Sequence, residues 1–249
     1  MRKIIHNEKN VGKEINHGTE SKVFLYTTKD GRRLALKRYR DYLSDYTIDT
    51  KQRKKKEEKL EFLSSIDDPD VVKIHDLVYK NGKLIGYTMD LLDGTEIKFS
   101  NSLEDRLKHL RSVRETFLRL NKKGIYVGDF RPSNFIWTPD GRTISIDIDN
   151  FKVSSELDFD LIPVCVNKYE NSECDSRYID SFCFNIYAIS MIDKYFPSED
   201  ELRDIKLPKC LKEESIKEYN EEAIRETISL NPSTYTGKIL KFPKNKKED

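Results

Sequence analysis

The sequence predicts an α+β protein of two lobes, with a small antiparallel β-sheet and one helix in the first lobe and a larger, mainly helical second lobe. Two observations predict the first lobe: β-prone runs before residue 92, and tight-turn signals that join them in pairs. The third is a change after residue 93, where apolar residues recur at helical spacing. We expect a first lobe over residues 1–92, a helical lobe over 93–240 and a disordered tail over 241–249.

The first lobe is predicted to follow the order strand, strand, helix, strand, strand. Residues 12–40 are β-prone, and four strands are predicted over 22–28, 32–39, 71–79 and 83–92. Lys29-Asp30-Gly31 separates the first pair, and Asn81-Gly82, a strong hairpin signal, joins the second. A helix is expected between the pairs over 51–66, because Leu60 and Leu63 recur on one face.

The second lobe is predicted to be helical around one short hairpin. Helices are expected over residues 103–124, 181–196 and 212–230. Gly124 is a plausible C-cap of the first of these helices. A short strand pair is expected on either side of Pro139-Asp140-Gly141, followed by a loop-like segment over 152–177.

The composition of the 249-residue chain excludes several classes of protein. Lys and Arg number 45 and Asp and Glu 44, so the formal net charge is +1. This balance provides no field for steering the chain onto nucleic acid or an anionic membrane. No apolar run is long enough to span a bilayer, and the amino terminus lacks the apolar stretch of a signal peptide. Four widely spaced cysteines fit reduced thiols better than zinc or disulfides, so we expect a cytoplasmic protein.

The segment GIYVGDFRPSNFIWTPDGRTISIDIDNF, residues 124–151, carries polar residues through an apolar frame. Asn134 follows Asp129 by five positions, and Asp147 follows Asn134 by thirteen. Asp is disfavoured in strands, so polar strand ends in a surface hairpin are one interpretation. The other is a magnesium and phosphate site, because magnesium takes few protein oxygen ligands and completes its shell with phosphate and water. The rest of the chain has to decide between them.

Taken together with residues elsewhere, this segment resembles the protein-kinase-like superfamily, and the likeness covers residues 12–195. Asp129 to Asn134 resembles the catalytic loop of that family, and Asp147-Ile148-Asp149 resembles its DFG motif. Ala35-Leu36-Lys37 is similar to the VAIK strand, and Asp180 to Phe184 resembles the helix start whose Asp braces the catalytic loop. The resemblance implies a bilobal protein-kinase-like fold that binds ATP and Mg²⁺.

The resemblance also implies a role for each matching residue. Asp129 would orient and deprotonate an acceptor hydroxyl. Asn134 and Asp147 would hold Mg²⁺. Lys37 and Arg131 would hold the phosphates. The other nucleotide-binding positions would surround adenine, cover the phosphates or pair with the strand lysine, and they are Ile15, Gly18, Val23, Ala35, Glu58, Met89, Asp90, Leu92 and Ile136.

The chain departs from the pattern of the family at several positions. The phosphate-covering loop keeps only Gly18 of GxGxxG, and Val127-Gly128 replaces the usual His-Arg pair. No Ala-Pro-Glu motif follows in residues 163–179. Asp149 takes the place of the DFG glycine, and a second register would make Asp149-Asn150-Phe151 the metal motif. Three glutamates compete for the pairing with Lys37, namely Glu57, Glu58 and Glu61.

We expect an ATP- and Mg²⁺-dependent phosphotransferase, a Ser/Thr protein kinase that transfers the γ-phosphate to a hydroxyl. One alternative is a small-molecule kinase acting on an amino-alcohol, sugar or antibiotic hydroxyl. The Gly128-Asp129 pair also resembles the corresponding site of small-molecule phosphotransferases. Another is a pseudokinase that binds nucleotide as a scaffold. The degraded glycine loop favours it, and it is opposed by the retained Lys37, Asp129, Asn134 and Asp147. The expected partners are ATP and a protein or small-molecule hydroxyl acceptor, with no nucleic acid and no membrane span.

Overall fold

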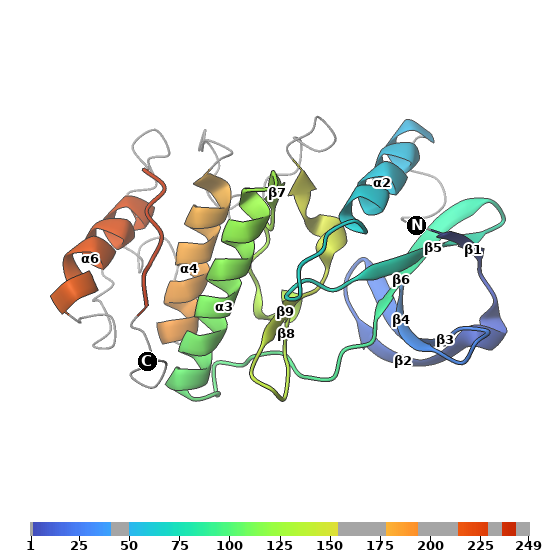
Figure 1. The fold of residues 1–249 in the computed structure, drawn as a ribbon, viewed down its shortest axis with the longest axis horizontal. Coiled ribbons are helices and arrows are strands. Elements are labelled where there is room, and N and C mark those ends of the chain that lie inside the picture. Colours follow the sequence, from blue (N-terminus) through green and yellow to red (C-terminus); the bar gives the residue numbers. More distant parts are fainter. Residues whose placement is uncertain (1, 41–49, 154–177, 194–213, 229–235, 243–249) are drawn as a thin grey trace. The chain divides into compact units, whose positions relative to one another are not determined.

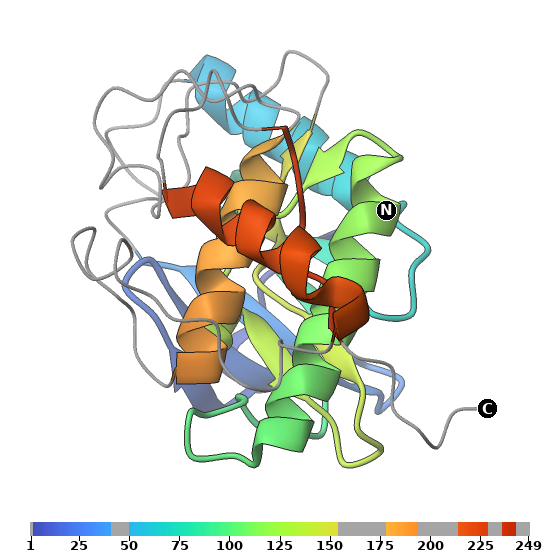
Figure 2. The same cartoon turned by 90° about the vertical axis from the view of Figure 1, so that its left-hand side faces the viewer.

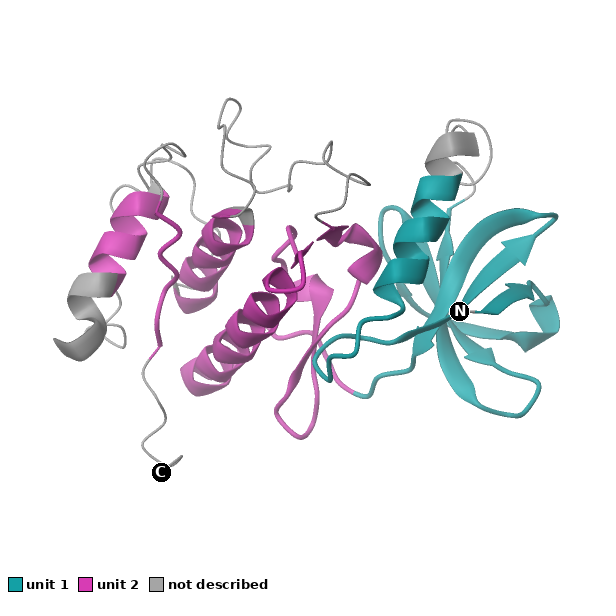
Figure 3. Cartoon of the chain, turned by 45° about the horizontal axis from the view of Figure 1, so that its top comes forward, with its two compact units in different colours: residues 1–93 teal, residues 94–249 magenta. Residues whose placement is uncertain are grey.

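The structure is a computed structural model that describes residues 2–40, 50–153, 178–193, 214–228 and 236–242. The chain divides into two compact units, Met1–Asp93 and Gly94–Asp249, which Figure 3 draws in different colours. We call them unit 1 and unit 2.

Unit 1 is built on a six-stranded mixed sheet. Its strands are β1 (Arg2–Ile5), β2 (Val11–His17), β3 (Ser21–Thr27), β4 (Arg33–Tyr39), β5 (Ile74–Lys80) and β6 (Lys83–Asp90). Their order across the sheet is β1-β5-β6-β4-β3-β2. β1 pairs with β5 in parallel, and every other neighbouring pair is antiparallel.

This order makes the sheet curl. β1 and β2 form its two opposite edges, yet only residues 6–10, with the 3₁₀ turn η1 (Glu8–Asn10), connect them. A flat sheet of six strands would hold its edges about 24 Å apart, whereas this connection reaches about 20 Å at most. Figure 1 shows the curled sheet. All six strands contribute to one apolar cluster on its concave side, formed by Tyr26, Leu34, Leu36 and Val78 with Ile4, Val11, Phe24 and Ile85 packed against them.

The helix α2 (Thr50–Leu63) lies between β4 and β5 in the chain. Its buried side chains include Leu60 and Leu63, which the helical spacing predicted to share a face. Lys3 of β1 lies 3.1 Å from the Glu57 carboxylate, so the edge strand also contacts α2.

Unit 2 contains three described helices, α3 (Leu103–Asn121), α4 (Ile179–Asp193) and α6 (Glu214–Ile228). Ser102 caps the start of α3, and its Oγ accepts the backbone N–H of Asp105 at 3.1 Å. The chain leaves the helix through Gly124 at a φ of 72°. α4 is apolar around its circumference, and it lies between α3 and α6 (Figures 1 and 2). Such a helix has to be buried, and Asp180 to Ile192 all are.

The described part of unit 2 also contains two short antiparallel strand pairs. β8 (Phe135–Trp137) pairs with β9 (Thr143–Ser145), and β7 (Ile125–Tyr126) pairs with β10 (Lys152–Val153). Two 3₁₀ turns flank them, η2 (Pro132–Asn134) and η3 (Ile148–Asn150). The hairpin predicted around Pro139-Asp140-Gly141 is therefore confirmed, whereas Lys152–Val153, expected to be loop, is a strand.

The predicted fold is wrong. We expected a bilobal protein-kinase-like fold with a small antiparallel sheet and a larger, mainly helical second lobe. The main body is instead a six-stranded mixed sheet, and the described residues form few helices. The sheet is larger than the four predicted strands because β1 and β2 add to it, and it is mixed because Arg2–Ile5 joins its edge in parallel with β5. Besides its three helices, the described part of unit 2 contains four short strands and two 3₁₀ turns.

Several expectations fall on residues that the structure does not describe. They include most of the loop-like segment 152–177, the region searched for an Ala-Pro-Glu motif, and most of the tail 241–249. Among the cysteines, Cys183 is described; it is buried and forms no disulfide with a described residue. In the described ranges, no helix has the length and apolar character that crossing a bilayer requires.

Candidate functional site

Buried aromatic side chains fix the loop between Asp129 and Asn134 at both ends. Phe130 follows Asp129 and is 4% exposed, and Phe135 follows Asn134 and is 1% exposed. The two ring centroids lie 6.3 Å apart, and Phe130 packs edge-on against Phe117 of α3 at 5.5 Å. This aromatic packing positions the backbone from which the two polar side chains project.

A buried carboxylate holds the turn that leads into this loop. Asp180 is fully buried at the start of α4, and it accepts the backbone N–H groups of Val127 at 2.8 Å and Gly128 at 2.7 Å. Asn121, with its amide oriented to donate, has Nδ2 at 2.8 Å from the same carboxylate. Burial raises the pKa of Asp180 to about 7, and the hydrogen bonds from Gly128 and Val127 oppose that rise. Asp180 thus braces the loop, as the resemblance implied.

Arg131 and Asn134 both contact Asp129. Arg131 Nε donates to Asp129 Oδ1 at 2.7 Å, and Arg131 Nη2 donates to the other carboxylate oxygen. Asn134 Nδ2 donates to Asp129 Oδ2 at 3.0 Å and to the Asp129 backbone carbonyl at 2.9 Å. The Asp129 side chain is 14% exposed and that of Arg131 is 50% exposed. The structure therefore brings three predicted site residues together, with Asp129 as the common acceptor.

The β8–β9 hairpin brings Asp147 to the same place. Phe135 pairs with Ser145, and the Ile146 N–H donates to the Asn134 carbonyl at 2.9 Å, so Asn134 and Asp147 lie at the same end of the hairpin. Asp147 has a φ of 61° and a ψ of 33°, in the left-handed region that few non-glycine residues adopt. A residue kept there at an energetic cost is a candidate for a functional constraint.

Asn134 and Asp147 fit the ligand preference of magnesium. The two hydrogen bonds donated by Asn134 Nδ2 fix the orientation of its amide, and Oδ1 accepts no hydrogen bond from the described residues. Asp147 adds a carboxylate, of which Oδ2 accepts Asn150 Nδ2 at 2.8 Å. The described residues contain no group of three or more His, Cys, Asp or Glu that could hold a metal. This pair alone therefore suits a cation that takes its remaining ligands from phosphate and water.

In unit 1, four predicted nucleotide-binding residues share one face of the sheet. Val23 pairs with Lys37 across β3 and β4, and Ala35 pairs with Met89 across β4 and β6. Paired residues point to the same side, and so do alternate residues along a strand. The apolar cluster occupies the opposite face. Lys37 is 6% exposed, with Nζ 5.9 Å from the centroid of the Tyr87 ring.

The turn predicted to cover phosphates is short and restrained. The Gly18 N–H donates to the Ser21 carbonyl at 2.8 Å, and Arg40 Nη2 donates to the Gly18 carbonyl at 2.8 Å. Gly18 does not have a positive φ, and a Cβ there would meet only the Ser21 oxygen, at 3.9 Å. Nothing in this conformation requires glycine. Ile15, predicted to contact adenine, lies on β2 and is 42% exposed.

The three competing glutamates of α2 have other partners. Lys3 Nζ lies 3.1 Å from Glu57 and 3.9 Å from Glu61. Glu58 lies 3.8 Å from Lys54 on the same helix. The resemblance implied that Glu58 pairs with the strand lysine. The described contacts of Glu58 do not include that lysine.

Of the remaining predicted positions, Asp90 and Leu92 lie at the end of β6, and Ile136 lies within β8. The Asp90 carboxylate lies 2.6 Å from His75 Nε2, and the Asp90 N–H donates to the Lys73 carbonyl at 3.1 Å, so that N–H is already used. Leu92 follows β6 and is partly exposed. Ile136 is partly exposed on β8, in unit 2.

Sequence reasoning missed the residues that position the loop without acting in it, among them Phe130, Phe135 and Asn121. One signal was present, because an apolar aromatic residue directly follows both Asp129 and Asn134. Asn121 carried no signal, since only the tertiary fold brings it to Asp180.

Comparison with known proteins supplies no family. No protein-family model matches the chain, and none of the curated proteins matches it.

Proposed function

We propose that this protein is a Mg²⁺-dependent phosphotransferase that moves the γ-phosphate of ATP to a hydroxyl, with a serine or threonine of a protein as the acceptor. The observation that carries the proposal is the arrangement of Asp129, Asn134 and Asp147 at one end of the β8–β9 hairpin. The proposal depends on this local arrangement within unit 2, and not on a likeness of the whole fold.

Phosphoryl transfer is catalysed mainly by positioning and by neutralising negative charge. Magnesium, when bound, would neutralise the negative charge of the phosphate. Asn134 Oδ1 and the Asp147 carboxylate would hold it. Asp129 would accept the proton of the acceptor hydroxyl and orient that hydroxyl toward the phosphate.

Arg131 has two roles in this proposal. In the structure its guanidinium binds both oxygens of Asp129, which keeps that carboxylate from acting as a base. Since the Arg131 side chain is 50% exposed, it can turn to a phosphate without an unfavourable burial of charge. Release of Asp129 would then accompany nucleotide binding.

The face of the sheet in unit 1 supports nucleotide binding. Lys37 provides a buried cation for phosphate, and Val23, Ala35 and Met89 provide apolar surface for adenine on the same face.

A second candidate function is nucleotide binding without transfer. The β2–β3 turn favours it, because Arg40 and the Gly18–Ser21 hydrogen bond restrain a turn that has no glycine at a positive φ. Backbone N–H groups approach phosphates most closely where glycine frees the chain, and this turn lacks that freedom.

The test is incubation with γ-labelled ATP and Mg²⁺, with and without a generic protein acceptor and a mixture of small hydroxyl compounds. Asp129→Asn and Asp147→Ala should both abolish transfer. Asp140→Asn is the matched control, since Asp140 is exposed at the turn of the same hairpin and should leave transfer unchanged. Asp149→Asn tests the second register of the metal motif and should retain most of the activity.

Label on protein that disappears in both site variants would support the proposal, and label on a small hydroxyl compound would change the acceptor class. Thermal stabilisation by ATP and Mg²⁺ that depends on Asp147, without transfer, would establish the second candidate. Absence of both transfer and nucleotide-dependent stabilisation would overturn both.

A further inference from the structure

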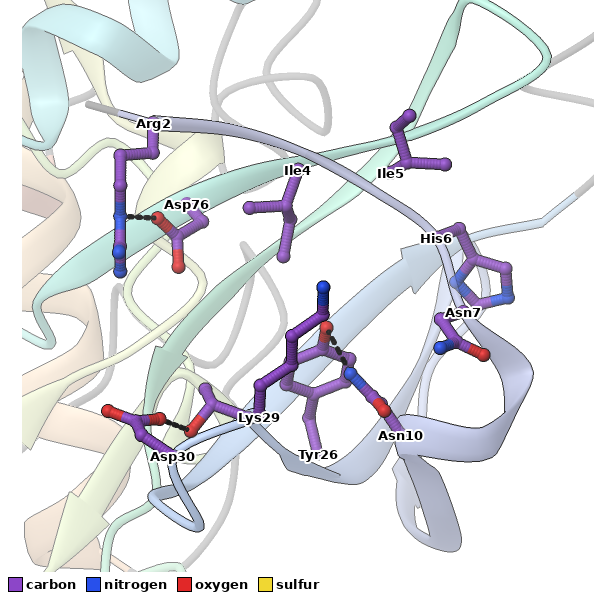
Figure 4. Close-up of a pocket in the computed structure, with 11 residues that line it drawn as sticks. Arg2, Ile4, Ile5, His6, Asn7, Asn10, Tyr26, Lys29, Asp30 and Asp76 are labelled. Carbon is purple, nitrogen blue, oxygen red and sulfur yellow. Dashed lines mark hydrogen bonds and ion pairs between the residues drawn. The ribbon is translucent and has the colours of Figure 1, made fainter.

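Unit 1 contains a hollow of about 800 Å³ beside β1, one edge strand of its curled sheet. None of the residues assigned to nucleotide binding or phosphoryl transfer lines this hollow. It opens between the edge strand β1, the connection that follows it and the β3–β4 turn, as the close-up in Figure 4 shows. Its volume lies in the range of small-molecule sites, and the mouth of a curled sheet is a common place for such sites.

The wall of the hollow is partly apolar. Ile4 and Tyr26 line it, and both belong to the apolar cluster inside the sheet. The Tyr26 hydroxyl accepts Asn10 Nδ2 at 3.2 Å, and Tyr26 is 3% exposed, so the partly exposed Ile4 provides the accessible apolar surface. A ligand with an apolar or aromatic body would remove this surface from water.

The carboxylates at the hollow already have partners, whereas one cation does not. Arg2 Nε donates to Asp76 at 3.0 Å, and Asp30 accepts the hydroxyl of Thr28, a hydrogen bond that lowers the pKa of Asp30. The Lys29 ammonium has no hydrogen bond or ion pair with any described residue. In the view of Figure 4, its side chain runs from the β3–β4 turn toward Ile4.

A buried imidazole at the hollow also has unmet hydrogen-bonding capacity. The His6 side chain is 2% exposed, and its Nδ1 has no hydrogen-bond partner among the described residues. Its Nε2 lies 3.0 Å from Glu8 Oε1, without the alignment of a hydrogen bond. A buried polar group in this condition is unfavourable unless something binds it.

We propose that this hollow binds a small organic anion, a carboxylate or phosphate monoester with an apolar or aromatic body. Lys29 receives the anionic group, and the body lies over Ile4. This site involves none of the residues assigned to phosphoryl transfer, so the two proposals stand or fall separately.

The test is a titration followed by backbone amide resonances in ¹H–¹⁵N NMR, with phenyl phosphate and benzoate as probes. Both should shift the amides of Ile4, Asn10 and Lys29 at millimolar concentration. Benzyl alcohol tests the body without the charge, and inorganic phosphate tests the charge without the body; each should bind at least about tenfold more weakly. A preference for phenyl phosphate over benzoate would identify the phosphate monoester as the source of the anion.

Lys29→Met should weaken binding of both probes about tenfold, because it removes one charged partner from an exposed turn without disturbing the core. Lys13→Met is the matched control, since Lys13 is exposed on β2 away from the hollow. The experiment works equally in an Asp147→Ala background. No shift at these amides, or shifts that Lys29→Met leaves unchanged, would overturn the proposal.

Discussion

The carboxylate of Asp180 accepts a 2.7 Å hydrogen bond from the backbone N–H of Gly128, 52 residues earlier in the chain. Gly128 has a φ of 72°, a conformation that glycine adopts without strain. The start of α4 therefore fixes the turn that precedes Asp129, although Asp180 itself lies too deep to meet a substrate. Its ionisation has a consequence for stability that can be measured.

Asp180→Asn should change how stability depends on pH. Burial raises the pKa of Asp180 from 3.8 to about 7, so between these values the folded state keeps a proton that the unfolded state has lost. The stability contributed by this group is therefore fully present below pH 4 and is lost as the pH rises through 7. Urea unfolding should show the free energy of unfolding of the wild type falling by up to about 4 kcal/mol relative to the variant between pH 4 and 8. Parallel curves for the two proteins would contradict this account.

Gly86→Ala should destabilise unit 1 strongly. A Cβ at Gly86 would lie 2.0 Å from the backbone oxygen of Lys37, and a strand backbone inside the sheet cannot retreat from it. We expect a loss of about 3 kcal/mol in the free energy of unfolding, at the upper end of overpacking costs. Gly18→Ala is the matched control, because its Cβ would meet nothing closer than 3.9 Å, and its effect should stay within about 0.5 kcal/mol. Chemical denaturation of the two variants checks this, and equal effects would show that the sheet adapts.

Local turn chemistry explains which parts of the sheet could be predicted. The two hairpin turns contain residues at a positive φ, namely Gly31 at 84°, Asn81 at 52° and Gly82 at 74°. These residue types predict such turns from the sequence. The four predicted strands form near the expected bounds for this reason. The strand Arg2–Ile5 could not be predicted, because it is short, lacks alternation and pairs with β5 far along the chain.

The candidate site divides in the same way. The order and spacing of Asp129, Asn134 and Asp147 were visible in the sequence, and the hairpin between the last two brings them to one end. The attachment of Arg131 to Asp129, and of Glu58 to Lys54, depends on side-chain directions that spacing does not encode. The pairing expected between Glu58 and Lys37 rested on the resemblance to a family rather than on a local signal, and the described contacts do not include it.

His109→Gln should make the protein less sensitive to acid. His109 is fully buried, with Nδ1 2.9 Å from the Thr143 hydroxyl and Nε2 2.6 Å from that of Tyr187. Burial lowers its pKa from 6.5 to about 3, so the stability it contributes is present above pH 6.5 and is lost as the pH falls toward 3. Gln has no charge to gain, so the acid unfolding midpoint followed by circular dichroism should move to lower pH.

The control for that experiment is His17→Gln, since the His17 side chain is 72% exposed and should not change the acid response. Asp180 acts in the opposite direction over part of the same range, because its stabilising protonated form is favoured by acid. The two slopes partly cancel in the wild type, so the effect of His109 is visible only against the single variant. An unchanged midpoint would show that the imidazole is hydrated before the protein unfolds.

Asp147→Gly and Asp147→Ala should separate function from strain. Both variants remove the carboxylate that we assign to Mg²⁺, so both should lose Mg²⁺-dependent stabilisation by ATP. They differ in backbone strain, because Asp147 occupies the left-handed region at a φ of 61°. Glycine adopts this conformation without strain, and alanine does not. Thermal and urea unfolding should therefore find the glycine variant more stable than the alanine variant by about 1 kcal/mol. Equal stability would mean that the backbone relaxes once the carboxylate is gone, and the left-handed conformation would then be a consequence of the carboxylate's contacts rather than of the fold.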